Sequence, residues 1–93
     1  MNIILKTSFL SRLANQVEFI AQDSPSQARK FKNDLFGRIR EIPKNPYLFR
    51  KSVYFDDTSI RDLIYKGYTI VFKITDDSIT VFGFIKYQHS LND

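Results

Sequence analysis

The sequence predicts an α+β fold, in which a short N-terminal strand and a helical hairpin pack on a small antiparallel sheet (β-α-α-β-β-β). Apolar residues in the first half of the chain recur at spacings of three and four, as on one face of a helix. Residues 60–86 instead read as three strands joined by two tight turns, and residues 68–75 show the period-two pattern of a half-buried strand. Helices followed by a run of strands are typical of α+β domains, and 93 residues fill one domain, 1–93.

The N-terminal part of the chain is expected to form an edge strand and a first helix. Asn2–Leu5 is a short apolar stretch, and Thr7 or Ser8 can cap the helix that follows. The expected apolar face of this helix consists of Leu10, Leu13, Val17 and Ile20.

A second helix is expected directly after the first. Ser24 is a good N-cap and Pro25 suits the first helical position, whereas Pro43 and Pro46 end the helix. Its expected apolar stripe consists of Ala28, Phe31, Leu35, Ile39 and Ile42. The short connection and the two facing stripes predict an antiparallel helical hairpin.

Residues 43–59 form a loop that is long for so small a domain, which indicates a functional or partner-contacting surface. We expect four aromatic side chains to pin it to the core: Tyr47, Phe49, Tyr54 and Phe55.

Three strands are expected after this loop. Lys66-Gly67 predicts a hairpin turn between Ile60–Tyr65 and Tyr68–Thr75, and Asp76-Asp77 turns the chain again. The last strand ends at Lys86 and is apolar on both faces, which predicts a central position in the sheet. Its two expected faces are Ile79, Val81, Gly83 and Ile85 against Thr80, Phe82, Phe84 and Lys86.

The positive charge of the chain is concentrated in one segment. The net charge is +4, but residues 29–51 alone hold eight basic and two acidic side chains. Such a patch attracts an acidic partner, either nucleic acid or an acidic protein segment. The alternative is a solvated helix face.

The sequence offers little for enzyme chemistry. It has one His, no Cys, no glycine-rich phosphate loop and no metal-ligand cluster, so no cofactor and no metal are expected. It also has no apolar run of the roughly 20 residues that a membrane span needs. We therefore expect a cytoplasmic protein with no membrane contact.

Five stretches together resemble the RelE/ParE superfamily of toxins from bacterial type II toxin–antitoxin pairs. They are residues 19–31 (FIAQDSPSQARKF), 39–52 (IREIPKNPYLFRKS), 60–63 (IRDL), 67–72 (GYTIVF) and 81–88 (VFGFIKYQ). The resemblance implies a RelE/ParE-like fold and a cytoplasmic toxin. It also implies an acidic antitoxin that wraps a helix and an extended segment over the toxin in a hetero-oligomer.

The superfamily divides into two activities. RelE-like members are ribosome-dependent mRNA endonucleases that use basic side chains on the sheet, whereas ParE-like members bind DNA gyrase. Where the best-known nucleases carry four basic residues, this chain has Ile60, Asp62, Thr69 and His89. Asp62 would repel a phosphate, so the comparison favours the ParE-like activity. Arg61, seven residues before Tyr68, also looks more ParE-like, as do residues 23–25 (DSP) and 45–47 (NPY).

Two sets of candidate site residues follow from the resemblance. If the protein is a metal-independent endoribonuclease with a divergent active site, its catalytic set would be Lys86, Tyr87 and His89. The expected partner-binding residues are Arg40, Arg50, Lys51 and Arg61. A third hypothesis is a degenerate family member that only binds its antitoxin.

Three of these residues have structural alternatives. His89 can be an exposed residue near the chain end, and the ring of Tyr87 can simply pack on the core. Arg61 can form a structural ion pair with one of three carboxylates: Glu41, Asp57 or Asp62.

Overall fold

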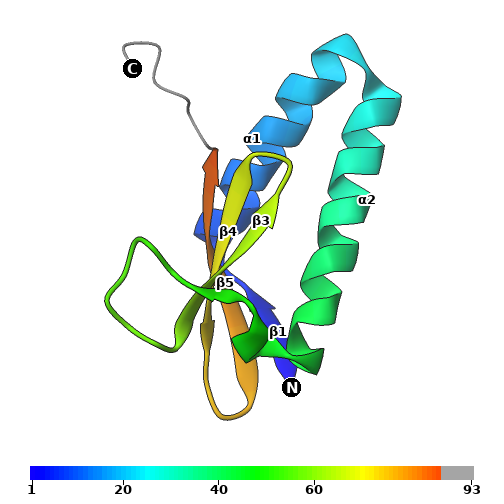
Figure 1. The fold of residues 1–93 in the computed structure, drawn as a ribbon. Coiled ribbons are helices and arrows are strands. Elements are labelled where there is room, and N and C mark those ends of the chain that lie inside the picture. Colours follow the sequence, from blue (N-terminus) through cyan, green and yellow to red (C-terminus); the bar gives the residue numbers. More distant parts are fainter. Residues whose placement is uncertain (87–93) are drawn as a thin grey trace, which may run out of the picture.

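The computed structural model describes residues 1–86 and has two layers, a helical hairpin on one face of a mixed sheet (Figure 1). This confirms the predicted α+β fold. The elements in order are β1 (Asn2–Leu5), α1 (Thr7–Asp23), α2 (Pro25–Glu41), two short 3-10 helices (Ile42–Lys44 and Pro46–Leu48), β2 (Arg50–Lys51), β3 (Ile60–Tyr65), β4 (Tyr68–Ile74) and β5 (Ser78–Lys86).

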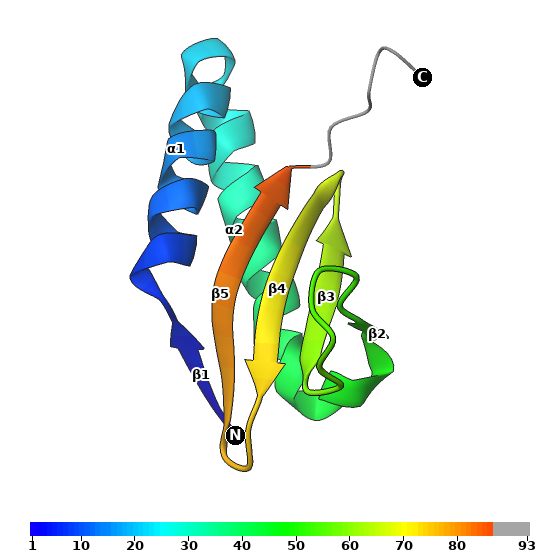
Figure 2. The ribbon, with the colours of Figure 1, turned by 90° about the vertical axis from the view of Figure 1, so that its left-hand side faces the viewer.

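The sheet has the strand order β1-β5-β4-β3-β2. The helical hairpin connects β1 at one edge of the sheet to β2 at the other edge. From β2 to β5 each strand pairs antiparallel with the next, and β5 lies beside β1 (Figure 2). β1 and β5 consequently run parallel. The sheet is therefore mixed, and the expectation of a wholly antiparallel sheet was wrong for this pair. The edge position of Asn2–Leu5 and the interior position of β5 are confirmed.

Helix α1 begins without a side-chain cap. Its N-cap is Lys6, whose backbone N–H still donates to the carbonyl of Val81 in β5 at 2.9 Å. The predicted cap by Thr7 or Ser8 was wrong, because Ser8 Oγ donates instead to the carbonyl of Phe82 at 3.2 Å. The chain thus enters the helix while it is still bonded to the sheet.

The buried face of α1 is shifted by one residue from the predicted stripe. Phe9 and Leu13 are buried, whereas Leu10 is 39% exposed. Val17 and Ile20 are partly buried against the core. The larger ring of Phe9 packs edge-on against Phe84 of β5 at a centroid distance of 6.0 Å, which turns Leu10 outward.

Helix α2 forms as predicted. The hydroxyl of Ser24 accepts a hydrogen bond from the backbone N–H of Gln27 at 3.2 Å, and Pro25 occupies the first turn. All five predicted stripe residues are buried, with Ile42 placed in the 3-10 turn that follows the helix.

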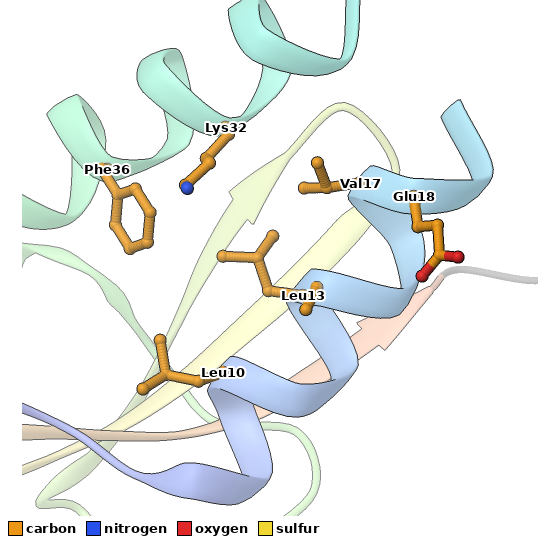
Figure 3. A pocket seen from close by; sticks show the side chains of 7 residues that line it. Leu10, Leu13, Val17, Glu18, Lys32 and Phe36 are labelled. Carbon is orange, nitrogen blue, oxygen red and sulfur yellow. The ribbon is translucent and has the colours of Figure 1, made fainter. Parts of the chain in front are cut away.

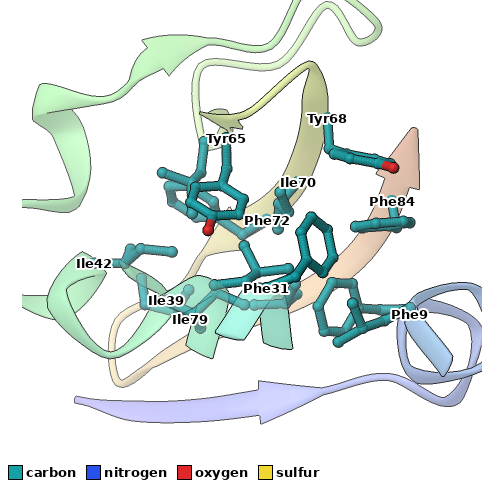
Figure 4. Close-up of a cluster of buried hydrophobic side chains, with 14 of the residues drawn as sticks. Phe9, Phe31, Ile39, Ile42, Tyr65, Tyr68, Ile70, Phe72, Ile79 and Phe84 are labelled. Atoms are coloured by element: carbon teal, nitrogen blue, oxygen red, sulfur yellow. The ribbon is translucent and has the colours of Figure 1, made fainter. Parts of the chain in front are cut away.

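Aromatic rings fill the core between the helices and the sheet (Figure 4). Tyr68 stacks on Phe84 at 5.0 Å, and Phe31 meets Tyr68 edge-on at 5.2 Å. The predicted turn between β3 and β4 is confirmed, because Lys66 and Gly67 both have positive φ, as a type I′ hairpin turn requires.

A β-bulge divides β5. Val71 of β4 pairs with Gly83, but the next residue, Phe72, pairs with Val81, so Phe82 is an extra residue in the strand. The bulge moves Phe84 to the helix-covered face and Gly83 to the opposite face, beside Val71. The predicted faces of the last strand were therefore wrong beyond Val81.

Candidate functional site

Residues 52–59 cross the face of the sheet that the helices leave open (Figure 2). We call this segment the strap. Backbone hydrogen bonds fix its two ends, one from Ser52 to the carbonyl of Ile60 at 2.9 Å and one from Ile60 to the carbonyl of Asp57 at 3.1 Å. Inside it, the N–H of Tyr54 donates to Ser52 Oγ at 3.2 Å, and Ser59 donates to Asp57 Oδ1 from both its N–H (2.9 Å) and its hydroxyl (2.7 Å). The strap is thus a fixed part of the fold.

The carboxylate of Asp62 lies under the strap and is only 2% exposed. Its Oδ2 accepts hydrogen bonds from Arg50 Nε at 3.1 Å and from the backbone N–H of Val53 at 3.2 Å. Arg50 Nη2 lies 3.1 Å from the same oxygen. One buried charge in β3 therefore fastens both β2 and the start of the strap.

Within residues 1–86, the open face has little unpaired positive charge. Besides the Arg50–Asp62 pair, Lys51 Nζ lies 3.7 Å from Asp56, and Lys73 Nζ lies 4.0 Å from Asp57. Hydrogen bonds from Ser59 lower the pKa of Asp57, with smaller contributions from the lysine charges. The acidic and basic groups of this face balance one another.

Large apolar side chains are exposed on this face. Val53 is 66%, Tyr54 49%, Phe55 43% and Ile64 45% exposed. Phe55 packs edge-on against the bulge residue Phe82 at 5.5 Å. A depression of about 410 Å³ beside them is lined by Arg50, Val53, Tyr54, Ile64, Gly67 and Thr69.

The prediction that four loop aromatics pin residues 43–59 to the core was wrong for three of them. Only Phe49 packs against the core, edge-on to Phe72 at 5.5 Å. Tyr47 is exposed in the 3-10 helix Pro46–Leu48, and the exposed Tyr54 and Phe55 belong to the strap, which runs on the side of the sheet opposite the helices (Figure 2).

A second apolar surface lies between the two helices (Figure 3). The groove has a volume of about 490 Å³ and is lined by Leu10, Leu13, Ala14, Val17, Glu18, Lys32 and Phe36. Lys30 is paired with Asp34 at 3.0 Å, which raises the pKa of Lys30. Arg29, Lys32 and Arg40 are exposed and form no ion pair within residues 1–86.

The family model for the ParE toxin of the type II toxin–antitoxin system parDE matches residues 3–90. The chain belongs to the ParE toxin family. No curated protein is similar enough to stand as a relative. The family implies an antitoxin partner, as the resemblance predicted.

In this ParE family member Arg61 holds backbone carbonyls. Its Nε donates to the carbonyl of Thr58 at 2.8 Å and its Nη1 to that of Phe49 at 3.1 Å, while the guanidinium lies 4.9 Å from the ring centre of Tyr47. Among the described residues it forms no ion pair, so the structural bridge to Glu41, Asp57 or Asp62 was wrong. Arg61 joins the strap to the 3-10 turns.

Of the candidate nuclease residues, the structure describes only Lys86, which lies away from the strap. Lys86 is exposed at the end of β5, where its Nζ lies 5.8 Å from the ring centre of Phe19 in α1. The bulge turns this part of the strand toward the helices, away from Asp62 and Thr69. Tyr87 and His89 lie outside the described residues.

The predicted partner-binding residues lie in two places. Arg40 is on α2, whereas Arg50, Lys51 and Arg61 belong to the strap and its anchors. Sequence reasoning missed the exposed residues Val53 and Ile64. The signal for Ile64 was its position two residues from Asp62, which puts an apolar side chain on the same face of the strand as a charged one.

The described part of the chain, residues 1–86, contains no group of three or more potential metal ligands. No helix in the same range has the length and apolar character needed to cross a membrane.

Proposed function

We propose that this ParE family member arrests growth by binding DNA gyrase through protein–protein contact, and that an acidic antitoxin neutralises it. The family assignment supports a toxin of a type II pair. The observation that carries the choice of activity is the Arg50–Asp62 pair on the open face of the sheet.

Asp62 stands where the resemblance to RelE-like nucleases would place a lysine. Its carboxylate is buried and paired, and the strap covers it. A phosphate at this place would meet a negative charge and paired cations instead of the free cations that stabilise a phosphorane-like transition state. The open face therefore supports contact with a protein better than cleavage of RNA.

The helical face supports the antitoxin contact. The groove between α1 and α2 has mostly apolar walls, and one exposed cation of α2, Lys32, lines it together with Glu18 of α1. An amphipathic, acidic antitoxin helix would bury its apolar side chains in such a groove and place carboxylates near Lys32. A segment of this kind folds on binding and can wrap further over the toxin.

A supercoiling assay with purified bacterial gyrase and relaxed plasmid tests the proposal. We expect the protein to inhibit supercoiling and to increase cleaved DNA. A translating extract run in parallel should retain intact mRNA, and cleavage within ribosome-bound codons would contradict the proposal. A protein with neither effect and no growth defect would instead be the degenerate, antitoxin-binding member.

The nuclease alternative has its own test. If Lys86 and His89 were catalytic, Lys86→Ala and His89→Ala would abolish growth arrest without unfolding the domain. Under the gyrase proposal, both variants remain toxic. Growth curves after induced expression separate the two outcomes.

A further inference from the structure

We infer that the strap surface, formed by Val53, Tyr54, Phe55 and Ile64, is where the toxin contacts its target, and that it binds an apolar, largely uncharged patch on a protein. The inference rests on the proposed function, because it names the surface through which that function would act. It places the target on the open face of the sheet, opposite the helices (Figures 1 and 2).

The strap presents these side chains in a fixed conformation. Its backbone is bonded at both ends, Val53 N–H is held by the buried carboxylate of Asp62, and Arg61 holds the carbonyl of Thr58. A flexible loop would lose conformational entropy on binding, whereas a loop fixed in advance loses little. These bonds hold apolar side chains toward solvent, where a partner can bind them, instead of letting them pack in the core.

The size and exposure of the side chains suit a binding surface. Four large apolar residues, each more than 40% exposed, lie on one face of a 93-residue chain. Contiguous apolar surface of this kind marks interaction sites, and tyrosines are common among the residues that dominate binding energy. The depression beside Tyr54 is large enough to receive an apolar side chain of the partner.

The charges of the face select the class of partner. Arg50, Lys51 and Lys73 are each paired with an aspartate, and Asp56 is fully exposed. Nucleic acid binding depends on cations that are free to neutralise phosphates. A face with balanced charges and exposed aliphatic and aromatic residues instead fits an uncharged protein patch. The α2 cations that have no ion-pair partner within residues 1–86 remain for an acidic partner.

The test compares three variants of the full chain. Tyr54→Asp and Val53→Asp place a charge on the strap surface, and Phe19→Asp is the matched control, because Phe19 is an aromatic residue with 57% exposure on α1. Circular dichroism and thermal melting first establish that each variant folds. Gyrase inhibition and growth arrest on induced expression are then measured side by side.

We expect Tyr54→Asp to raise the gyrase-inhibiting concentration at least about tenfold, as for a residue that dominates an interface. Val53→Asp should act in the same direction, and Phe19→Asp should match the wild type. Folded strap variants that inhibit and arrest growth like the wild type would overturn the inference. Equal losses of gyrase inhibition in all three variants would also overturn it. The same holds if the wild type binds a labelled single-stranded RNA saturably and Tyr54→Asp abolishes that binding.

Growth arrest separates the two proposals. If the wild type arrests growth without inhibiting gyrase, the gyrase proposal fails, whereas loss of arrest in the strap variants alone still supports the strap surface as the target contact. A wild type that neither inhibits gyrase nor arrests growth defeats the proposed function, and the inference with it.

Discussion

Asp62 and Arg50 form an ion pair in which the carboxylate is buried and the guanidinium is about half exposed, with Arg50 Nη2 3.1 Å from Asp62 Oδ2. A second donor, the backbone N–H of Val53, shares the same oxygen. The pair joins β2, β3 and the strap at one point. A single carboxylate therefore fastens β2 and the start of the strap to β3.

The first prediction concerns this pair. Asp62→Ala leaves Arg50 and the Val53 N–H without their acceptor, and should lower the free energy of unfolding by about 2–4 kcal/mol, near the range for breaking a buried pair. Asp34→Ala, which breaks the exposed Lys30–Asp34 pair, should change it far less, because solvent screens an exposed pair. Urea unfolding measures both, and equal effects would contradict the anchoring role of Asp62.

The second prediction concerns the bulge in β5. A Cβ added at Gly83 would lie 2.9 Å from the Cβ of Val71, so Gly83→Ala should destabilise the sheet by about 1–3 kcal/mol. Gly37 lies in α2, where an added Cβ has only the end of the Arg40 side chain within 4 Å, at 3.8 Å. Gly37→Ala should stabilise the protein by up to about 1 kcal/mol through helix propensity. Thermal unfolding of the two variants should shift in opposite directions.

The bulge also shows how far the sequence could predict this fold. Periodicity and capping residues were sufficient for α2, because Ser24, Pro25 and the stripe act locally. They were insufficient for β5, because both faces of that strand are apolar. The sequence pattern therefore fits a regular strand as well as a strand with one extra residue at Phe82. The direction of β1 depends on a partner strand more than 70 residues away, which no local pattern specifies.

The candidate site was predictable only in part. The long loop and the charged residues Arg50, Lys51 and Arg61 directed attention to the segment that forms the strap and its flanking strands. Their roles depend on neighbours that only the fold brings together, so Arg61 bonds carbonyls instead of a carboxylate. Whether Tyr54 faces the core or solvent is decided by the side of the sheet on which the strap crosses, and composition carries no information about that side.

The third prediction concerns a buried hydroxyl. Tyr65 is buried, and its hydroxyl has no hydrogen-bond partner among residues 1–86. Tyr65→Phe removes an unsatisfied polar group while it keeps the ring contact with Phe31, so stability should be unchanged or rise by up to about 1 kcal/mol. Tyr65→Ala is the comparison, because loss of the ring should cost about 3–5 kcal/mol. A clear loss of stability in Tyr65→Phe would show that the hydroxyl does have a partner.

The fourth prediction is a pH dependence at Tyr68. Burial raises the pKa of its phenol above the ordinary value of 10.0, and this outweighs the opposing effect of a hydrogen bond with Gln16. The folded state therefore holds the phenolic proton more tightly than the unfolded state. The resulting stabilisation is present below pH 10 and is lost as the pH rises through the raised pKa. The wild type should lose stability more steeply than Tyr68→Phe above about pH 10, and parallel curves would exclude this origin.

The fifth prediction separates the two faces by their response to salt. Antitoxin binding should weaken as the salt concentration rises, because the cations of α2 attract an acidic segment. Lys32→Ala should weaken binding a few-fold at low salt and reduce its salt dependence, since Lys32 lies at the groove and is exposed.

Lys30→Ala is the matched control, because Lys30 is already paired with Asp34. Titration calorimetry with the cognate antitoxin measures both. An equal salt dependence in the two variants would place the antitoxin away from the groove, whereas gyrase inhibition through the charge-balanced strap surface should change little with salt.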